Sequence, residues 1–219
     1  MHDDLPASFR PPRLTLITNS SRLSGEPFFD LLEQALSGGL DAVLVREKTL
    51  TSAKLLALAS RLRQMTDAHQ ARLIIHSQAD IAAAVGADGV HLASSDINTI
   101  ASVRQWLMQS EMSVSVSCHN ADELKLAYDN GADYAMLSPV FPTQTHPGEA
   151  HLGVDEFDRL VASAKLPVIA LGGVSLDSCV ALQGRSLAVI GAILAADDAK
   201  KATQQLLNAV VASDRVGAS

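Results

Sequence analysis

The segment GADGVHLASSD, residues 86–96, contains the pattern that decides the fold of this chain. Its first glycine follows a short helical segment, and the run GVHLA is apolar, too short for a helix and followed directly by polar residues. Similar openings, GLDAV at Gly39 and GADYA at Gly131, precede two further apolar runs. Because a glycine just past a helix end can adopt the left-handed conformation that closes the helix, each opening predicts a turn from helix to strand.

Short β-rich runs recur along the whole chain and alternate with segments of helical periodicity. The predicted strands are residues 13–19, 42–47, 72–77, 89–93, 113–119, 134–140, 167–173 and 187–193. Near-continuous apolar runs of this length are typical of parallel strands that are buried on both faces. Eight strand-then-helix units predict an α/β fold, a single (β/α)8 TIM barrel, and an open doubly wound sheet is the alternative.

Length and composition agree with one soluble barrel. The chain has 219 residues, 47% hydrophobic and 19% charged, and we predict a barrel domain over residues 13–212 with flexible ends at 1–12 and 213–219. A formal net charge of -7 without a Lys/Arg-rich run argues against nucleic-acid or anionic-membrane partners. No signal peptide or membrane span is recognisable, so we expect a cytoplasmic protein with Cys118 and Cys179 as free thiols.

Polar residues gather where the predicted strands end. In barrels of this type the active site lies at the C-terminal ends of the strands, so these positions are the best candidates for a site. They are Arg46 and Lys48, His76, Ser94, Ser95 and Asp96, Ser117 and His119, and Thr143, Thr145 and His146. Gly172 and Gly173 follow the seventh strand and Gly191 lies in the eighth, where backbone N–H groups can approach a phosphate that no Cβ blocks. We therefore expect a small phosphorylated substrate.

Arg46 and Lys48 flank Glu47 at the end of the second strand. Because side chains alternate along a strand, both cations can face the mouth and bind a second anionic group. The alternative is that they form a surface ion pair with Glu47 or with a helix.

The histidines near the strand ends are candidates for proton transfer. His119 has a reference pKa near neutrality, so it can both accept and donate a proton at cytoplasmic pH. His76 and His146 are further candidates for contact with the substrate, whereas His91 lies inside a strand and is expected to pack or to hydrogen-bond behind the site. These residues come from separate strands without metal-ligand spacing, so the sequence does not predict a zinc site.

Over residues 14–212 the chain resembles the thiamin-phosphate synthase family and its TenI-type relatives. The resemblance rests on VREK (residues 45–48), ADGVHLASSD (87–96), VSCHNADEL (116–124), GADYAMLSPVFPTQTHPG (131–148) and ALGGV (170–174). It implies a (β/α)8 barrel that binds a thiazole ethyl phosphate. In the synthases, the thiazole nitrogen displaces pyrophosphate from a hydroxymethylpyrimidine pyrophosphate that is held by Mg²⁺.

The chain departs from the synthase pattern at three places. The family's Asn-Asp-Arg motif after the third strand corresponds to His76-Ser77-Gln78 here, the Gly-Gln before the second acidic residue corresponds to Ala93-Ser94, and the lysine that usually ends the threonine loop corresponds to His146. One metal-binding carboxylate and two cations are therefore replaced. Charge neutralisation is the main help available to a departing pyrophosphate, so these changes argue against the synthase reaction.

TenI-type thiazole tautomerases are similar and use the same barrel without a metal step or another cofactor. This resemblance implies His119 as acid and base, Arg46 and Lys48 near the substrate carboxylate, Thr143 and Thr145 on the substrate, and the three glycines around the phosphate. The pattern SCHN, LSPV and ALGG also resembles the TenI-like domains that are fused to some Nudix hydrolases. On this basis the sequence favours a tautomerase.

Two alternatives remain open. The first is a true synthase in which Asp96 and water hold Mg²⁺, and the second is a non-catalytic protein that binds a phosphorylated ligand. A homodimer is a further expectation from the behaviour of the family.

Overall fold

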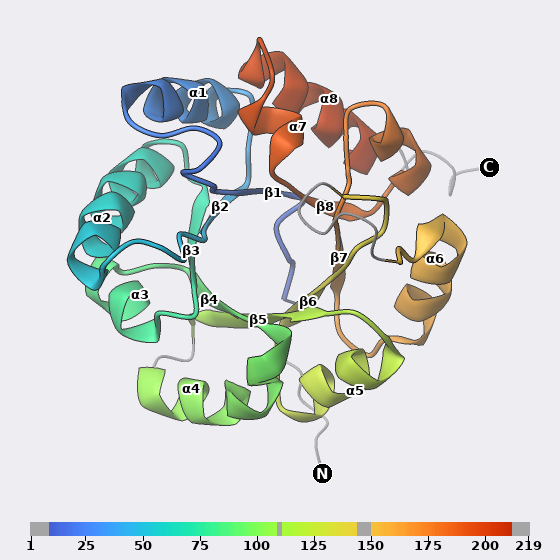
Figure 1. The fold of residues 1–219 in the computed structure, drawn as a ribbon. Helices are drawn as coiled ribbons and strands as arrows, with labels where there is room; N and C mark the ends of the chain where they lie inside the picture. Colours follow the sequence, from blue (N-terminus) through green and yellow to red (C-terminus); the bar gives the residue numbers. More distant parts are fainter. Residues whose placement is uncertain (1–8, 109–110, 144–149, 212–219) are drawn as a thin grey trace.

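In the computed structural model, parallel strands close into a barrel that is surrounded by helices (Figure 1). The structure describes residues 9–108, 111–143 and 150–211. The strands are β1 (Leu14–Ile17), β2 (Ala42–Val45), β3 (Arg72–His76), β4 (Gly89–Leu92), β5 (Ser113–Cys118), β6 (Tyr134–Leu137), β7 (Val168–Leu171) and β8 (Ser186–Val189). Each strand pairs with the next and β8 pairs with β1, so the predicted (β/α)8 barrel is confirmed and the open sheet is excluded.

Helices follow most of the strands and form the outer ring. They are α1 (Glu26–Ser37), α2 (Ser52–Ala68), α3 (Ala79–Val85), α4 (Ile100–Leu107), α5 (Ala121–Asp129), α6 (Gly153–Ser163), α7 (Gly191–Leu194) and α8 (Ala199–Val211). Two 3₁₀ segments complete the ring, η1 (Ser94–Thr99) before α4 and η2 (Ser178–Leu182) between β7 and β8. The prediction that Gly191 lies within the eighth strand is wrong. The backbone of Ile190 has left the strand conformation, with φ -119° and ψ -77°, and Gly191 begins α7.

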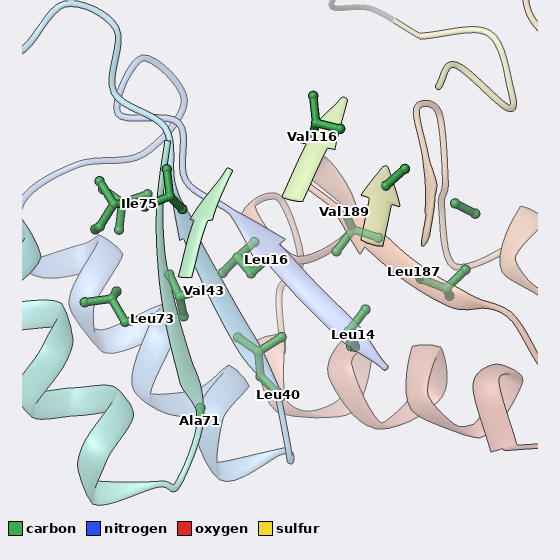
Figure 2. Close-up of a cluster of buried hydrophobic side chains, with 14 of the residues drawn as sticks. Leu14, Leu16, Leu40, Val43, Ala71, Leu73, Ile75, Val116, Leu187 and Val189 are labelled. Atoms are coloured by element: carbon green, nitrogen blue, oxygen red, sulfur yellow. The ribbon is translucent and has the colours of Figure 1, made fainter. Parts of the chain in front are cut away.

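Alternation along the strands separates two hydrophobic clusters. Outward side chains such as Leu16, Val43 and Ile75 pack between the strands and the helices, as Figure 2 shows. A smaller cluster fills the barrel axis and consists of Ile17, Ala42, Leu44, Ile74, Tyr134, Met136, Ile169 and Ala188. Among the described residues, these side chains pack the barrel axis, so a ligand site is expected at an end of the barrel.

The three repeated openings have the backbone geometry that the sequence predicts. Gly39, Gly86 and Gly131 have φ values of 97°, 62° and 85°, and each lies between a helix and the next strand. An L-residue side chain is disfavoured at such angles.

The aspartates of these openings join neighbouring strands at the N-terminal end of the barrel. Asp88 accepts a hydrogen bond from the backbone N–H of Leu73 at 2.7 Å, and Asp133 accepts one from Val114 at 2.7 Å. Asp41 accepts the N–H groups at the start of β1 in the same way. Each carboxylate also accepts from an arginine, namely Arg13, Arg63 and Arg104 for Asp41, Asp88 and Asp133 in turn. The repeat thus links β1 to β2, β3 to β4 and β5 to β6.

The chain before β1 covers the same end of the barrel. The ring of Phe9 stacks on Tyr134, with 5.5 Å between centroids and 7° between planes, and Arg72 donates to the carbonyl oxygen of Arg10 at 2.8 Å. Cys118 and Cys179 are buried free thiols, as predicted. No helix in the described part of the chain is both long and apolar enough to cross a membrane.

Candidate active site

A cavity of about 700 Å³ opens at the C-terminal ends of the strands. The predicted residues that line it are Arg46, Lys48, His76, Ser94, Ser117, His119, Thr143, Gly172, Gly173 and Gly191, whereas Ser95 and Asp96 are not among its lining residues. Thr145 and His146 lie outside the described residues. A smaller cavity of about 250 Å³ lies beside the large one and shares Lys48 and His76 with it. Residues from distant parts of the chain therefore meet at one mouth, while their individual roles stay predictions.

The loop after β7 passes too close to the loop after β6 for any side chain. A Cβ on Gly172 would lie 2.6 Å from the Cα of Pro139, and a Cβ on Gly173 would lie 2.4 Å from the carbonyl oxygen of Pro142. Both glycines also have positive φ, 94° and 67°. Space and backbone conformation therefore both require glycine at these two positions.

Several backbone N–H groups on this side of the cavity are available to a ligand. Those of Gly173, Val174, Gly191 and Ala192 donate to no other residue in the described ranges, and all four residues line the cavity. Unpaired N–H groups that converge on one space form a site for an anion. This arrangement fits the phosphate site that the glycines predict.

Arg22 is a cation at this site that the strand-end rule does not find. It lines the cavity, and its Nη1 lies 3.4 Å from the position that a Cβ of Gly191 would take. It comes from the loop between β1 and α1, several residues after the strand, so its position along the sequence gives no signal. A cation beside the free N–H groups adds to the attraction for phosphate.

The opposite side of the cavity carries neutral polar side chains. Strand register places His76 beside His91 and His91 beside Ser115. The Nδ1 of His91 lies 2.9 Å from the Ser115 hydroxyl oxygen, and its Nε2 lies 2.9 Å from that of Ser117. Hydrogen bonding by His91 agrees with its predicted role, but His91 also lines the cavity, which the sequence did not indicate.

Both of these histidines are uncharged near neutral pH. Burial, followed by the positive charges of Arg46 and Lys48, lowers the pKa of His76 to about 4. Burial, with smaller effects of His76 and Arg46, lowers the pKa of His91 to about 3. Arg46 and Lys48 therefore act on the His76 side of the mouth. Within the described residues, no ion pair joins Glu47 to Arg46 or Lys48, and the Glu47 carboxylate accepts from the hydroxyl of Ser20 at 2.6 Å.

One hydrogen bond determines the tautomer of the neutral His119 ring. Its Nδ1 lies 2.7 Å from the carbonyl oxygen of Ser138, and because a carbonyl only accepts, Nδ1 carries the proton of the neutral ring. Its backbone N–H donates to Glu123, which is itself fixed by Asn120 at the start of α5. The remaining ring nitrogen, Nε2, is left as an acceptor on an exposed residue at the cavity.

The mouth offers few metal ligands. The described residues include no group of three His, Cys, Asp or Glu side chains that could hold a metal ion. Asp96 is close enough for its charge to raise the pKa of His76, and its Oδ1 accepts from Ser95. Because Mg²⁺ is often held by one or two carboxylates together with substrate phosphates and water, Asp96 fits as the protein ligand of an Mg²⁺ that binds with a pyrophosphate.

Comparison with known proteins identifies the family. The family model described as thiamine monophosphate synthase matches residues 14–195. The chain belongs to this family. The thiamine-phosphate synthase of Ruminiclostridium cellulolyticum is 31% identical over 90% of this chain and 95% of its own length. That of Methanobrevibacter smithii is 32% identical over 89% and 93%.

A solved structure supports the same assignment to the thiamine monophosphate synthase family. Thiamine phosphate pyrophosphorylase from Pyrococcus furiosus superposes with a TM-score of 0.79 at 30% identity, and the match covers 90% of this chain and 94% of that protein. 3-Hexulose-6-phosphate synthase, at 22% identity and a TM-score of 0.66, shares the fold.

The prediction that favours a TenI-type tautomerase over a synthase is wrong. Relatives that match this chain over about nine-tenths of its length at 31% and 32% identity are named synthases, which are transferases. The prediction of the family itself is confirmed. The replacement of the Asn-Asp-Arg motif is therefore a weaker guide to the reaction than the likeness of the whole chain.

Proposed function

We propose that this chain is a thiamine-phosphate synthase, which joins hydroxymethylpyrimidine pyrophosphate to a thiazole phosphate. The observation that carries the proposal is the likeness, over nearly the whole barrel, to two proteins that bear this name. A mouth with a phosphate side and a separate polar side supports a reaction between two small ligands.

The reaction makes one bond and breaks one. The thiazole nitrogen forms a C–N bond to the exocyclic carbon of the pyrimidine, and the C–O bond to pyrophosphate breaks with its electron pair on the leaving oxygen. The enzyme can accelerate this step by holding the two ligands together and by stabilising the charge that develops on pyrophosphate. Arg46 and Lys48 supply positive charge at the mouth, and Mg²⁺ on Asp96 would supply more.

The other residues bind and orient the ligands. In this proposal the N–H groups around Gly173 and Gly191 and the guanidinium of Arg22 hold the thiazole phosphate. Thr143 supplies a hydroxyl from the loop after β6, and His119 presents its Nε2 as an acceptor. Thr145 and His146, which follow Thr143 closely in the sequence, remain candidates for contact with the substrate.

The direct test is product formation. Purified protein is incubated with hydroxymethylpyrimidine pyrophosphate and the thiazole phosphate, with and without Mg²⁺, and thiamin phosphate and pyrophosphate are measured together. We expect equal amounts of both products, and much less of each without Mg²⁺. Binding of the thiazole phosphate without any product in either condition would contradict the proposal.

A pair of arginine variants shows whether the products come from this cavity. Arg46→Gln removes a cation that lines the mouth, and we expect kcat to fall roughly 100-fold, as is usual when a group that stabilises transition-state charge is lost. Arg61→Gln is the matched control, because Arg61 is paired with Glu26 on the outer surface. Equal activity of the two variants would place the chemistry elsewhere.

A further inference from the structure

We infer that His91 is a positioning residue that fixes the direction of the Ser117 hydroxyl, so that Ser117 accepts a hydrogen bond from an amino group of the ligand. The hydrogen bonds of β4 and β5 carry this inference. The proposed function enters only in the choice of a pyrimidine as the ligand.

The three side chains form a line from the barrel interior to the cavity. Ser115 is fully buried and does not line the cavity, His91 is 2% exposed, and Ser117 is half-buried at the cavity wall. The His91 ring contacts a hydroxyl oxygen with each nitrogen, at 2.9 Å in both cases. Each contact is a hydrogen bond only if one proton lies between its two atoms, so the position of one proton determines the next.

The contacts of Ser115, at the buried end of the line, determine which atom donates in each of these hydrogen bonds. The Ser115 hydroxyl oxygen also lies 3.4 Å from the carbonyl oxygen of Val90, which can only accept, and it neighbours the buried hydroxyl of Tyr134, which can donate or accept. If Ser115 donates to Val90, the Nδ1–H of His91 donates to Ser115 and its Nε2 accepts from the Ser117 hydroxyl. In the reverse arrangement, two acceptor oxygens would face each other in a buried site with no proton between them. Such a contact is unfavourable, so the first arrangement is preferred.

The ring keeps this single proton under ordinary conditions. The pKa of His91 is about 3, because burial disfavours the charged ring, so Nε2 stays unprotonated at neutral pH. Since the Ser117 proton is used by His91, the oxygen of Ser117 presents only lone pairs to the cavity. A ligand N–H is favoured there, and a ligand carbonyl oxygen is disfavoured because it would meet another acceptor.

The predicted specificity can be measured by binding alone. The probes are the pyrophosphates of 4-amino-5-hydroxymethyl-2-methylpyrimidine and of its 4-oxo counterpart, compared by calorimetry. We expect the amino compound to bind about 10-fold or more tightly, the value of one good hydrogen bond. Equal affinities would overturn the inference. Because no turnover is needed, this outcome is distinct from failure of the synthase reaction.

Two serines on the same strand provide a matched pair of variants. Ser115→Ala removes the acceptor of Nδ1–H, so the proton of His91 should move to Nε2 and the Ser117 hydroxyl should turn toward the cavity. We expect the preference for the amino compound to fall about 10-fold, although Ser115 does not touch the ligand. Ser113→Ala is the control, because Ser113 is also buried on β5 but donates to the backbone carbonyl oxygen of Asp88. If both variants change the preference equally, the inference is wrong.

Two further measurements separate positioning from a structural role. In a Ser117→Ala background, Ser115→Ala should leave the ratio of the two affinities unchanged, whereas independent effects would add. The tautomer itself can be read in the unaltered protein from the ¹⁵N shifts of His91, which does not depend on the folding of a variant. A proton on Nε2 would overturn the inference.

Discussion

The two sides of the cavity mouth bind a ligand by different means. On the β7–β8 side, Gly173 and Gly191 offer backbone N–H groups and no side chain. On the β3–β5 side, His76 and Ser117 offer neutral polar side chains. The first side depends on space and backbone angles, and the second depends on where individual protons lie. The comparison teaches that the phosphate side can be disrupted by adding one carbon, whereas the polar side is changed by moving one hydrogen.

The largest expected effect is on the phosphate side, at Gly173. In Gly173→Ala the new Cβ meets the carbonyl oxygen of Pro142 at 2.4 Å, and the residue has φ of 67°. We expect a loss of roughly 2–4 kcal/mol in the free energy of unfolding and no detectable binding of inorganic phosphate. Urea unfolding and calorimetry provide the measurements.

Gly191→Ala is the matched control for that variant. Its Cβ would lie 3.4 Å from Arg22 Nη1, and no positive φ is involved. We expect nearly unchanged stability and weaker phosphate binding. If Gly173→Ala behaved in the same way as Gly191→Ala, the requirement for glycine at 173 would be refuted.

The polar side gives the next effect, a loss of stability in acid. His76 and His91 have folded-state pKa values of about 4 and about 3, below their ordinary value of 6.5. Above pH 6.5 both are neutral in the folded and unfolded chains, so they cause no pH dependence. As the pH falls from 6.5 toward 4, the unfolded chain binds protons that the folded chain does not, and stability falls, with a limit of about 1.4 kcal/mol per pH unit for each histidine.

Two variants test whether His76 contributes to this pH dependence of stability. His76→Asn should reduce the pH dependence of the free energy of unfolding between pH 6.5 and 4. His151→Gln should not, because the side chain of His151 is exposed to solvent. A slope that is the same in both variants would show that the polar side is not its source.

A smaller effect concerns the charges on the polar side. Arg46 lowers the pKa of His76, so Arg46→Gln should raise that pKa, although burial, the larger cause, remains. An NMR titration of the His76 ring measures the change, with Arg61→Gln as the unaffected comparison. A His76 pKa that does not move would mean that the guanidinium is directed away from the ring.

The smallest effect is expected at the N-terminal end of the barrel, far from both sides of the cavity mouth. Phe9→Ala removes the ring that stacks on Tyr134, and we expect a loss of about 1 kcal/mol in stability with unchanged phosphate binding. Thermal unfolding and calorimetry test this. A change in phosphate affinity would show that the two ends of the barrel are coupled.

Much of the fold could be predicted from the sequence because each strand is a short apolar run between helical segments. The roles of Asp41, Asp88 and Asp133 could not, although they recur at one position of the repeat, because their partners lie on another strand. The end of β8 before Gly191 also escaped prediction, since GAIL is as apolar as a strand and its helical conformation depends on packing.

The candidate site was predictable where it follows strand ends. That rule placed His119 and Gly173 at the cavity, but it could not find Arg22, which lies on a loop whose path is set by tertiary contacts. The same rule predicts that His91 lies behind the site and not at the cavity. The sequence gives neither the register between strands nor the hydrogen-bond partners of a ring nitrogen. The replacements at Ser77, Gln78 and His146 favour a tautomerase, which the names of the similar proteins contradict.

The aspartates at the N-terminal end have a mechanical consequence. Their hydrogen bonds link β1 to β2, β3 to β4 and β5 to β6. Strands β7 and β8 are joined by their backbone pairing and, within the described residues, by no such aspartate. We therefore expect thermal breathing of the ring to begin at β7 and β8, the strands whose loops carry the phosphate glycines. A phosphate bound across these two loops would then provide the link between β7 and β8 that the aspartates provide for the other three strand pairs.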